Sequence, residues 1–367
     1  MAETTRTEAE DSGRDAPGVM RRGGFYNRHS LPQHEAASYA EPVLRQAAEA
    51  VSAPASGQTI VIADYGAAQG RNSLDPMRQA IGIIRRRIPD AVPISVVHTD
   101  IPADDFSALF ALVENSPDSY LRDTANVFPF AAGRTFYRQI FPAASVSLGW
   151  SAIAVHWLSA APATIEGHIW SPRADGPALA AFARQSARNW WDFLSHRAAE
   201  LRPGARLVVI GGASDEAGDS GANGLMDMAN EVLRDLVAAG HLSADEYRRM
   251  AIPTYNRTPA EFAAPFADGA ASGLTVLHRQ LDVLADPLLA QYRETGDLNA
   301  VAASCTGFFE AAFEPSLFSS LAEGRGAAER QSLLRQFRDG LKAKIAAAPQ
   351  EASCAWRVFT MLIAKDG

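Results

Sequence analysis

Thr59-Ile-Val-Ile-Ala-Asp-Tyr-Gly-Ala-Ala-Gln-Gly-Arg-Asn-Ser-Leu74 is the stretch that decides the fold. Its first five residues are β-branched or apolar, as in a parallel strand that is covered on both faces. The strand ends at Asp64, and Gly66 and Gly70 then allow a sharp turn that brings bare backbone close to a ligand. A helix is expected from Leu74. This sequence of strand, acid, glycines and helix predicts a nucleotide-type pocket at the carboxyl edge of an open α/β sheet.

The spacing of the glycines argues against a pyrophosphate ligand. Residues 64–72 read Asp-x-Gly-x-x-x-Gly-x-Asn, whereas the dinucleotide fingerprint is Gly-x-Gly-x-x-Gly and a P-loop carries a lysine after its last glycine. An acid at the strand end favours a ligand with an ammonium or sulfonium group, such as S-adenosylmethionine; an ordinary tight turn is the alternative. Asp100 ends the next expected strand, where an acid can accept hydrogen bonds from both ribose hydroxyls of a nucleoside.

Composition limits the classes of function. The chain has 367 residues, 47% of them hydrophobic, which is enough for one large domain with an elaboration or for two domains. Its net charge of -8 argues against a nucleic-acid or polybasic membrane partner. Cys305 and Cys354 lie in no metal or redox spacing, which predicts unpaired thiols in a reducing cytoplasm. Residues 1–20 are expected to form a disordered tail rather than a signal peptide, and no run is apolar enough to span a membrane.

Strands and helices alternate along the rest of the chain, which predicts an α/β fold with a Rossmann-like sheet, helices on both of its faces and an α-helical cap. The expected parts are an N-terminal segment with the α/β core over residues 21–212, a helical cap insertion over 213–270, and the remaining core strands and cap helices over 271–367. Residues 213–266 show helices and turns without a strand, and such an insertion beside the strand ends can roof a pocket.

The polar and aromatic residues leave several interpretations open. The eight histidines form no HExxH or other close ligand pair, so no catalytic metal is expected. Trp150, His156 and Trp157 cluster near a strand end and could be core residues, although an indole N–H that faces a pocket is a good partner for a carboxylate. His156 could bind a polar acceptor or take a proton from a nitrogen nucleophile, or it could be a core imidazole.

Several motifs, taken together in their order and separations, resemble those of the plant-type SABATH methyltransferases. These enzymes transfer a methyl group from S-adenosylmethionine to carboxyl groups or, in some members, to ring nitrogens. The likeness runs from about residue 23 to the C-terminus. It rests on Gly23-Gly-Phe-Tyr-x-x-x-Ser-x-x-Gln33, Ile62-Ala-Asp-Tyr-Gly-x-x-x-Gly-x-Asn-Ser-Leu74, Asp100-Ile-Pro-x-x-Asp-Phe-x-x-Leu-Phe110, Thr135-Phe-Tyr-x-x-x-Phe-Pro142, Trp157-Leu-Ser-x-x-Pro162 and Ile252-Pro-x-Tyr255.

The resemblance implies a role for each matching residue. The methionine part of the cofactor would be held by Tyr26, Ser30, Asp64, Gly66 and Asn72, and its ribose and adenine by Asp100, Ile101, Thr135 and Phe136. The acceptor carboxylate would be held by Gln33 and Trp157. The rest of the acceptor pocket would be formed by Ile153, His156, Met226, Tyr255 and Phe309. The family is often homodimeric, so a homodimer is expected.

Departures from the family pattern concentrate at the acceptor end. The usual Ser-Ser-Tyr-Ser is Ser151-Ala-Ile-Ala154 here, so a pocket tyrosine becomes Ile153. A frequent methionine becomes His156, and a common cap tryptophan aligns with Met226. We therefore expect a methyltransferase that uses S-adenosylmethionine to form the methyl ester of a small aromatic, indole or fatty acid. The alternatives are an N-methyltransferase of a nitrogen heterocycle and a non-catalytic protein that binds S-adenosylmethionine.

Overall fold

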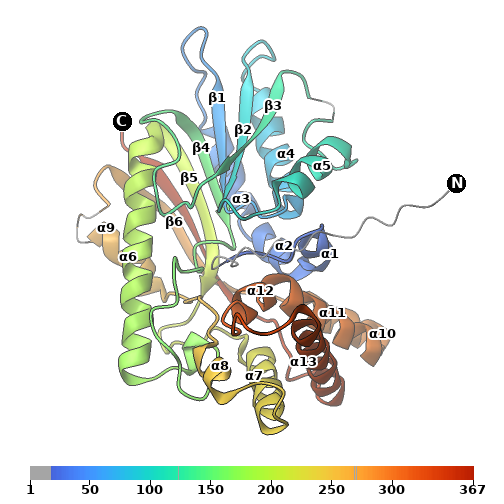
Figure 1. Cartoon of the computed structure of the whole chain (residues 1–367). Helices are drawn as coiled ribbons and strands as arrows, with labels where there is room; N and C mark the ends of the chain where they lie inside the picture. The colour runs from blue at the N-terminus through green and yellow to red at the C-terminus, as the bar shows by residue number, and fades with distance from the viewer. Residues whose placement is uncertain (1–17, 123, 268, 270) are drawn as a thin grey trace, which may run out of the picture.

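The computed structural model describes residues 18–122, 124–267, 269 and 271–367. Its centre is a seven-stranded sheet with the order β3-β2-β1-β4-β5-β7-β6 (Figure 1). The strands are β1 (Ile60–Tyr65), β2 (Ile94–Asp100), β3 (Val127–Gly133), β4 (Val146–Ala152), β5 (Leu201–Ala213), β6 (Leu274–Val283) and β7 (Arg357–Lys365). The strands from β3 to β5 run parallel, and β7 runs antiparallel to both β5 and β6. This sheet confirms the expected α/β class.

Helices cover both faces of the sheet because successive residues of its buried strands point to opposite sides. In β5, Val208 and Ile210 join one apolar cluster, and Leu207 and Val209 join another. The first cluster includes side chains of α3 (Glu41–Glu49), α4 (Arg71–Arg85) and α5 (Phe106–Asn115). The second includes side chains of α6 (Gly176–Glu200) and α9 (Pro259–Ala267). The apolar run at the start of the deciding stretch is thus buried from both sides.

The glycine turn differs from the expectation at its end. The sequence predicts a helix from Leu74, but α4 begins at Arg71, and Gly70 occupies its N-cap in the left-handed region with φ 87°. The physical reason is that glycine adopts this conformation without a steric penalty, so the helix starts directly after the turn. Asn72 and Ser73 therefore lie in the first turn of α4 and line the cavity described below.

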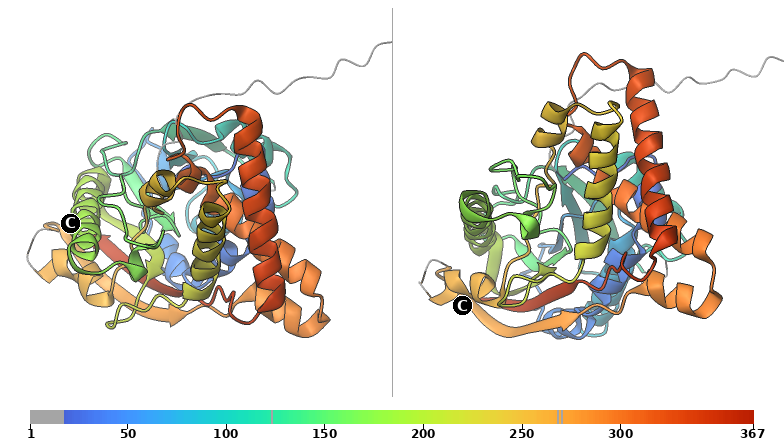
Figure 2. Two further views of the ribbon diagram at one scale, coloured as in Figure 1. Left: turned by 60° about the horizontal axis from the view of Figure 1, so that its bottom comes forward. Right: turned by 90° about the horizontal axis from the view of Figure 1, so that it is seen from below.

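A third apolar cluster forms a helical cap on the carboxyl side of the sheet (Figures 1 and 2). Two of its helices, α7 (Asn223–Ala238) and α8 (Ala244–Arg249), lie between β5 and β6 in the chain. The others, α10 (Pro287–Thr295), α11 (Leu298–Ala312), α12 (Glu314–Phe318) and α13 (Ala327–Ala347), lie between β6 and β7. Two separate segments of the chain therefore build one cap.

The N-terminal segment lies between the sheet and the cap (Figure 1). Its helices are α1 (Phe25–His29), which packs on α11, and α2 (Leu31–Ser38), which packs on α4 and α10. Of the tail expected over residues 1–20, residues 1–17 lie outside the described part. Val19 is buried, and the backbone N–H of Gly18 donates to Ser316 Oγ. None of the described helices combines the length and the apolar character of a membrane span.

Candidate active site

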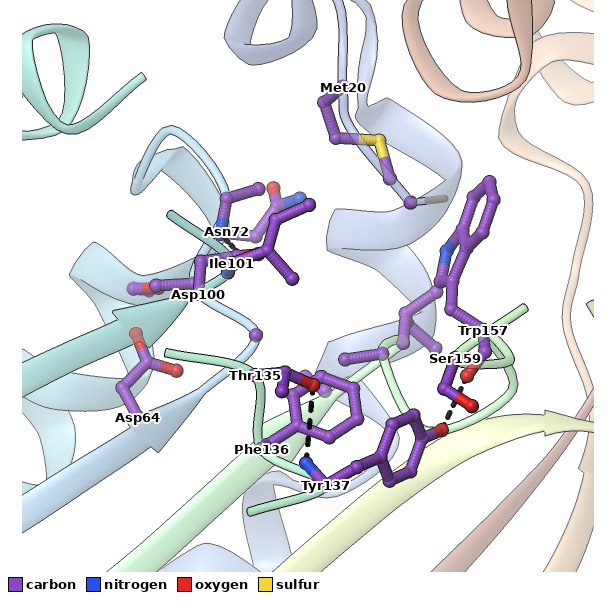
Figure 3. A pocket seen from close by; sticks show the side chains of 18 of the residues that line it. Met20, Asp64, Asn72, Asp100, Ile101, Thr135, Phe136, Tyr137, Trp157 and Ser159 are labelled. Carbon is purple, nitrogen blue, oxygen red and sulfur yellow. Dashed lines mark hydrogen bonds between the residues drawn. The ribbon is translucent and has the colours of Figure 1, made fainter. Parts of the chain in front are cut away.

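A cavity of about 460 Å³ lies at the carboxyl ends of β1, β2 and β4 (Figure 3). Parallel strands present their carboxyl ends at the same edge of a sheet, so residues that are far apart in sequence meet there. Most of the site residues predicted from the sequence line this cavity: Tyr26, Gln33, Asp64, Gly66, Asn72, Asp100, Ile101, Thr135, Phe136, Ile153 and Trp157.

The glycine turn after β1 forms one wall of the cavity with backbone atoms. Gly66 has φ 89°, and its N–H donates to the carbonyl oxygen of Thr99 at 2.8 Å. A Cβ atom at position 66 would overlap the Cβ of Ala154, which follows β4. Glycine is therefore required here both by its conformation and by the close approach of the β4 loop.

Carboxylates cluster at the ends of β1 and β2. Asp100 accepts hydrogen bonds from the backbone N–H groups of Ala68 at 2.8 Å and Ile101 at 2.7 Å. Burial raises the pKa of Asp100 to about 6, against the effect of these two donors. Burial and the charge of Asp100 raise the pKa of Asp104 to about 8, so Asp100 ionises first. Among the described residues that line the cavity, Arg138 has the only cationic side chain, so this end suits a ligand with a positive charge.

The loop after β3 supplies an aromatic surface opposite the acids. Thr135 and Phe136 line the cavity together with Ile101 (Figure 3). The loop is held from behind by Arg197, whose guanidinium donates to the carbonyl oxygens of Phe136 at 2.7 Å and Arg138 at 3.0 Å. This surface can accept the flat ring of a nucleobase.

Trp157 lies across the cavity from Asp64 and Asp100, and Gln33 is a further lining residue (Figure 3). Gln33 is 5% exposed, and its Oε1 is buried without a hydrogen-bond partner among the described residues. The indole nitrogen of Trp157 faces the cavity (Figure 3). The Trp157 ring is stacked on Phe313 with centroids 5.8 Å apart, and Gly18 lies close to its ring atoms. The indole N–H of Trp157 and the side-chain amide N–H of Gln33 are donors at the cavity, which suits a ligand with acceptor oxygens, whereas Gln33 Oε1 can only accept.

Five of the predicted residues do not line this cavity. Ser30 is buried, and its Oγ is 3.4 Å from Asn72 Oδ1. Met226 and Phe309 are buried in the apolar cluster of the cap. The hydroxyl of Tyr255 donates to Glu261 at 2.9 Å.

The fifth, His156, is held in the protein interior. Its Nδ1 accepts a hydrogen bond from the backbone N–H of Gly212 at 3.4 Å, and its ring lies against the backbone of that glycine. Burial lowers the pKa of His156 to about 3, so the imidazole is neutral. This is the core arrangement that the sequence analysis left open, and it differs from the acceptor contact that the family resemblance implies.

Other lining residues were given no site role in the sequence analysis, and many of them come from parts of the chain that only tertiary packing brings together. They are Gly18, Met20, Ala67, Ala68, Ser73, Tyr137, Arg138, Trp150, Ala152, Ala154, Leu158, Ser159, Asn189 and Asp192. Met20 falls within the tail that was expected to be disordered. Asn189 and Asp192 lie within α6, and no local motif marks them. Ser159 belongs to the motif Trp157-Leu-Ser-x-x-Pro162, but the sequence analysis gave it no role.

Comparisons with known proteins agree on one family. A family profile described as SAM dependent carboxyl methyltransferase matches residues 21–323. Methyltransferase LUC1 of Fusarium sp is 31% identical over 246 residues, which cover 65% of this chain and 64% of that protein. Anthranilate O-methyltransferase 3 of Zea mays is 28% identical over 262 residues, which cover 65% and 69% of the two chains. The matched region thus spans just under two thirds of the length of the first of these relatives.

A solved structure shows a similar fold. The structure titled "Loganic acid methyltransferase with SAH" superposes with a TM-score of 0.75, at 18% sequence identity. The match covers 96% of this chain and 99% of that one. It therefore includes both the sheet and the cap.

Proposed function

This chain belongs to the family of SAM-dependent carboxyl methyltransferases, and we propose that it forms the methyl ester of a small-molecule carboxylic acid. The observation that carries the proposal is that one cavity brings acids and two side-chain N–H donors together. Asp64 and Asp100 lie across this cavity from Trp157, and Gln33 also lines it (Figure 3). The acids suit a cationic nucleoside, and the indole N–H of Trp157 and the amide N–H of Gln33 can donate to a carboxylate.

The residues present fit S-adenosylmethionine as the methyl donor. Asp100 would accept hydrogen bonds from the ribose hydroxyls, with Ile101, Thr135 and Phe136 around the adenine. Asp64 would meet the ammonium group, and Tyr26, Asn72 and the backbone at Gly66 would surround the rest of the methionine part. Bound S-adenosylmethionine supplies an electrophilic methyl group. The protein supplies shape and a negative potential that favours the cationic ligand.

The residues at the acceptor end have to position the acceptor acid, and they do not have to activate it. A carboxylic acid has a pKa of about 4, so at neutral pH it is already the nucleophilic carboxylate and needs no general base. Gln33 and Trp157 would orient one carboxylate oxygen toward the methyl group. Such orientation can lower a barrier by about 7–11 kcal/mol, because it replaces a bimolecular encounter. Their hydrogen bonds must be moderate, because charge leaves the carboxylate as the ester forms.

Aromatic, indole and fatty acids are the proposed acceptor classes. Relatives are named for anthranilate, gibberellic acid and benzoic or salicylic acid. Ile153 in place of an aromatic side chain leaves an aliphatic wall at the cavity, which supports an acceptor with a sizeable apolar part. N-methylation is less well supported, because His156 is neutral, bonded to Gly212 and outside the lining.

The direct test is methyl transfer from labelled S-adenosylmethionine to a panel of aromatic, indole and fatty acids and nitrogen heterocycles. We expect label in products that release it on alkaline hydrolysis, as methyl esters do. Base-stable label would instead establish N-methylation. Binding of the cofactor without transfer to any member of the panel would favour a non-catalytic protein that binds S-adenosylmethionine.

Replacement of Trp157 by phenylalanine should affect the acceptor and spare the cofactor. Phenylalanine keeps the aromatic contact with Phe313 but removes the indole N–H, and a hydrogen bond to a charged group contributes about 1.5–3 kcal/mol. We expect kcat/KM for the acid to fall by roughly tenfold or more, mainly through KM, while the Kd of S-adenosylhomocysteine stays within about twofold. Trp191→Phe is the matched control, because Trp191 is 49% exposed on α6. Equal losses of acceptor and cofactor affinity would contradict the assignment.

Location and assembly are further parts of the proposal. A reducing cytoplasm is supported by Cys305 and Cys354, which are both buried free thiols. A homodimer is supported by the family resemblance alone. Sedimentation of the purified chain tests the assembly, and a monomer at all concentrations would contradict it.

A further inference from the structure

Three buried polar side chains form a chain of hydrogen bonds that ends at the cavity. Asp64 is the last residue but one of β1 and pairs in register with His98 of β2. His98 Nδ1 lies 2.8 Å from Asp64 Oδ2, and His98 Nε2 lies 2.9 Å from the hydroxyl oxygen of Tyr120. His98 and Tyr120 are 0% exposed and Asp64 is 2% exposed, so water does not compete for these bonds.

The chemistry of the partners fixes the direction of each bond. An ionised carboxylate can only accept, so His98 carries its hydrogen on Nδ1 and donates to Asp64. A ring that carries this single hydrogen accepts at Nε2, and the Tyr120 hydroxyl can then donate to it. Burial and the charge of Asp64 raise the pKa of Tyr120, which keeps this hydroxyl protonated and able to donate. The chain therefore runs from Tyr120 through His98 to Asp64.

This arrangement restrains the one group of the three that lines the cavity. Asp64 is among the lining residues, whereas His98 and Tyr120 are not. The bond from His98 occupies Oδ2 and limits rotation of the carboxylate, while Oδ1 is outside this chain of bonds. A donor at this position also stabilises the negative charge of a carboxylate that is removed from water.

We propose that His98 is a positioning residue, which with Tyr120 holds the Asp64 carboxylate oriented toward the ammonium group of the cofactor's amino-acid part. The inference rests on the proposed function, since it assumes that Asp64 meets that ammonium. The ammonium is the fitting partner because the neighbouring carboxylate of the same amino acid would be repelled by Asp64. The effect of His98 is thus confined to one end of the cofactor.

The test compares two ligands that share the nucleoside and differ at that end. S-adenosylhomocysteine carries the ammonium, and methylthioadenosine lacks the whole amino-acid part but keeps the ribose and adenine. For His98→Leu we expect the Kd of S-adenosylhomocysteine to rise by about tenfold or more, from the loss of a bond to a charged group. The Kd of methylthioadenosine should stay within about twofold of the wild-type value, as measured by calorimetry.

Conservative variants separate positioning from a merely structural role. The side-chain amide of His98→Asn can present an N–H where Nδ1–H stands, so this variant should recover most of the lost affinity. Tyr120→Phe keeps the ring and removes the donor to Nε2, and we expect a loss of several-fold for S-adenosylhomocysteine alone. In an Asp64→Asn background, His98→Leu should add little further loss, because His98 acts through Asp64.

The outcomes distinguish a failure of the positioning role of His98 from a failure of the proposed function. Equal loss of both ligands in His98→Leu, no rescue by asparagine, or additive losses with Asp64→Asn would overturn the positioning role while leaving the proposed function intact. A wild-type chain that binds neither ligand would overturn the proposed function itself. Methylthioadenosine binding also reports that each variant is folded, so a misfolded variant cannot be taken for support.

Discussion

Replacement of Arg197 by methionine should lower the free energy of unfolding by about 3–5 kcal/mol, because it leaves the carboxylate of Glu200 buried without its counter-ion. Arg197 and Glu200 are both 0% exposed and form an ion pair at 2.8 Å within α6. The Glu200 carboxylate also accepts from the Tyr65 hydroxyl at 2.9 Å and from the backbone N–H of Phe141 at 3.1 Å. Urea denaturation measures the loss.

The matched control is Arg188→Met, because Arg188 lies on the same helix and is exposed. It should change the free energy of unfolding by less than about 0.5 kcal/mol. The double variant Arg197→Met with Glu200→Gln should recover part of the stability, since no buried charge is then left unpaired. A loss below about 1 kcal/mol in Arg197→Met would show that the pair behaves like a surface salt bridge.

Asp100→Ala should weaken S-adenosylhomocysteine binding by roughly a hundredfold to ten-thousandfold. The carboxylate is expected to accept two ribose hydrogen bonds, each worth about 1.5–3 kcal/mol to a charged acceptor. It also holds the N–H groups of Ala68 and Ile101, so its removal loosens the turn at the cavity wall. Calorimetry gives the Kd, and Asp339→Ala on an exposed face of α13 is the control.

The pH dependence of the wild-type protein checks the same assignment. Burial raises the pKa of Asp100 to about 6, so the group takes up a proton as the pH falls through that value. The protonated form offers one acceptor fewer to the ribose, and affinity for S-adenosylhomocysteine should fall below about pH 6 and level off above it. Asp100→Ala should lose this dependence. A wild-type affinity that is flat from about pH 5 to about pH 8 would contradict the role of Asp100.

Local sequence predicts the lining residues proposed for the cofactor better than those proposed for the acceptor. Short motifs are enough to predict the glycine turn and the acids at the strand ends. Asp64 and Asp100 each lie at the carboxyl end of an apolar strand that can be recognised from its own sequence. Thr135 and Phe136 also line the cavity, and their positions depend mainly on the order of strands in the sheet. No local motif marks the buried Arg197–Glu200 ion pair behind their loop.

The acceptor end depends on contacts between distant parts of the chain. His156 is turned inward because its ring packs on Gly212 of β5, and no pattern around residue 156 encodes that contact. Met226 is a core residue because α7 packs against other cap helices. Met20 reaches the cavity because Arg21 bonds through its backbone N–H to Ala311 at 3.0 Å. Such long-range packing cannot be deduced from periodicity or propensity.

The place of β7 in the sheet has a consequence for biosynthesis. This strand comes after all the other elements in the chain, yet it lies between β5 and β6 and pairs with both. During translation β6 therefore leaves the ribosome before its only neighbour in the described sheet, and all the cap helices also emerge before β7. Closing the long loop between β5 and β7 is entropically unfavourable until both sides of β7 can pair. Until β7 is made, the nascent chain thus exposes the edge of β5 and the edge of β6 that β7 later covers, and it is most vulnerable to aggregation in that interval.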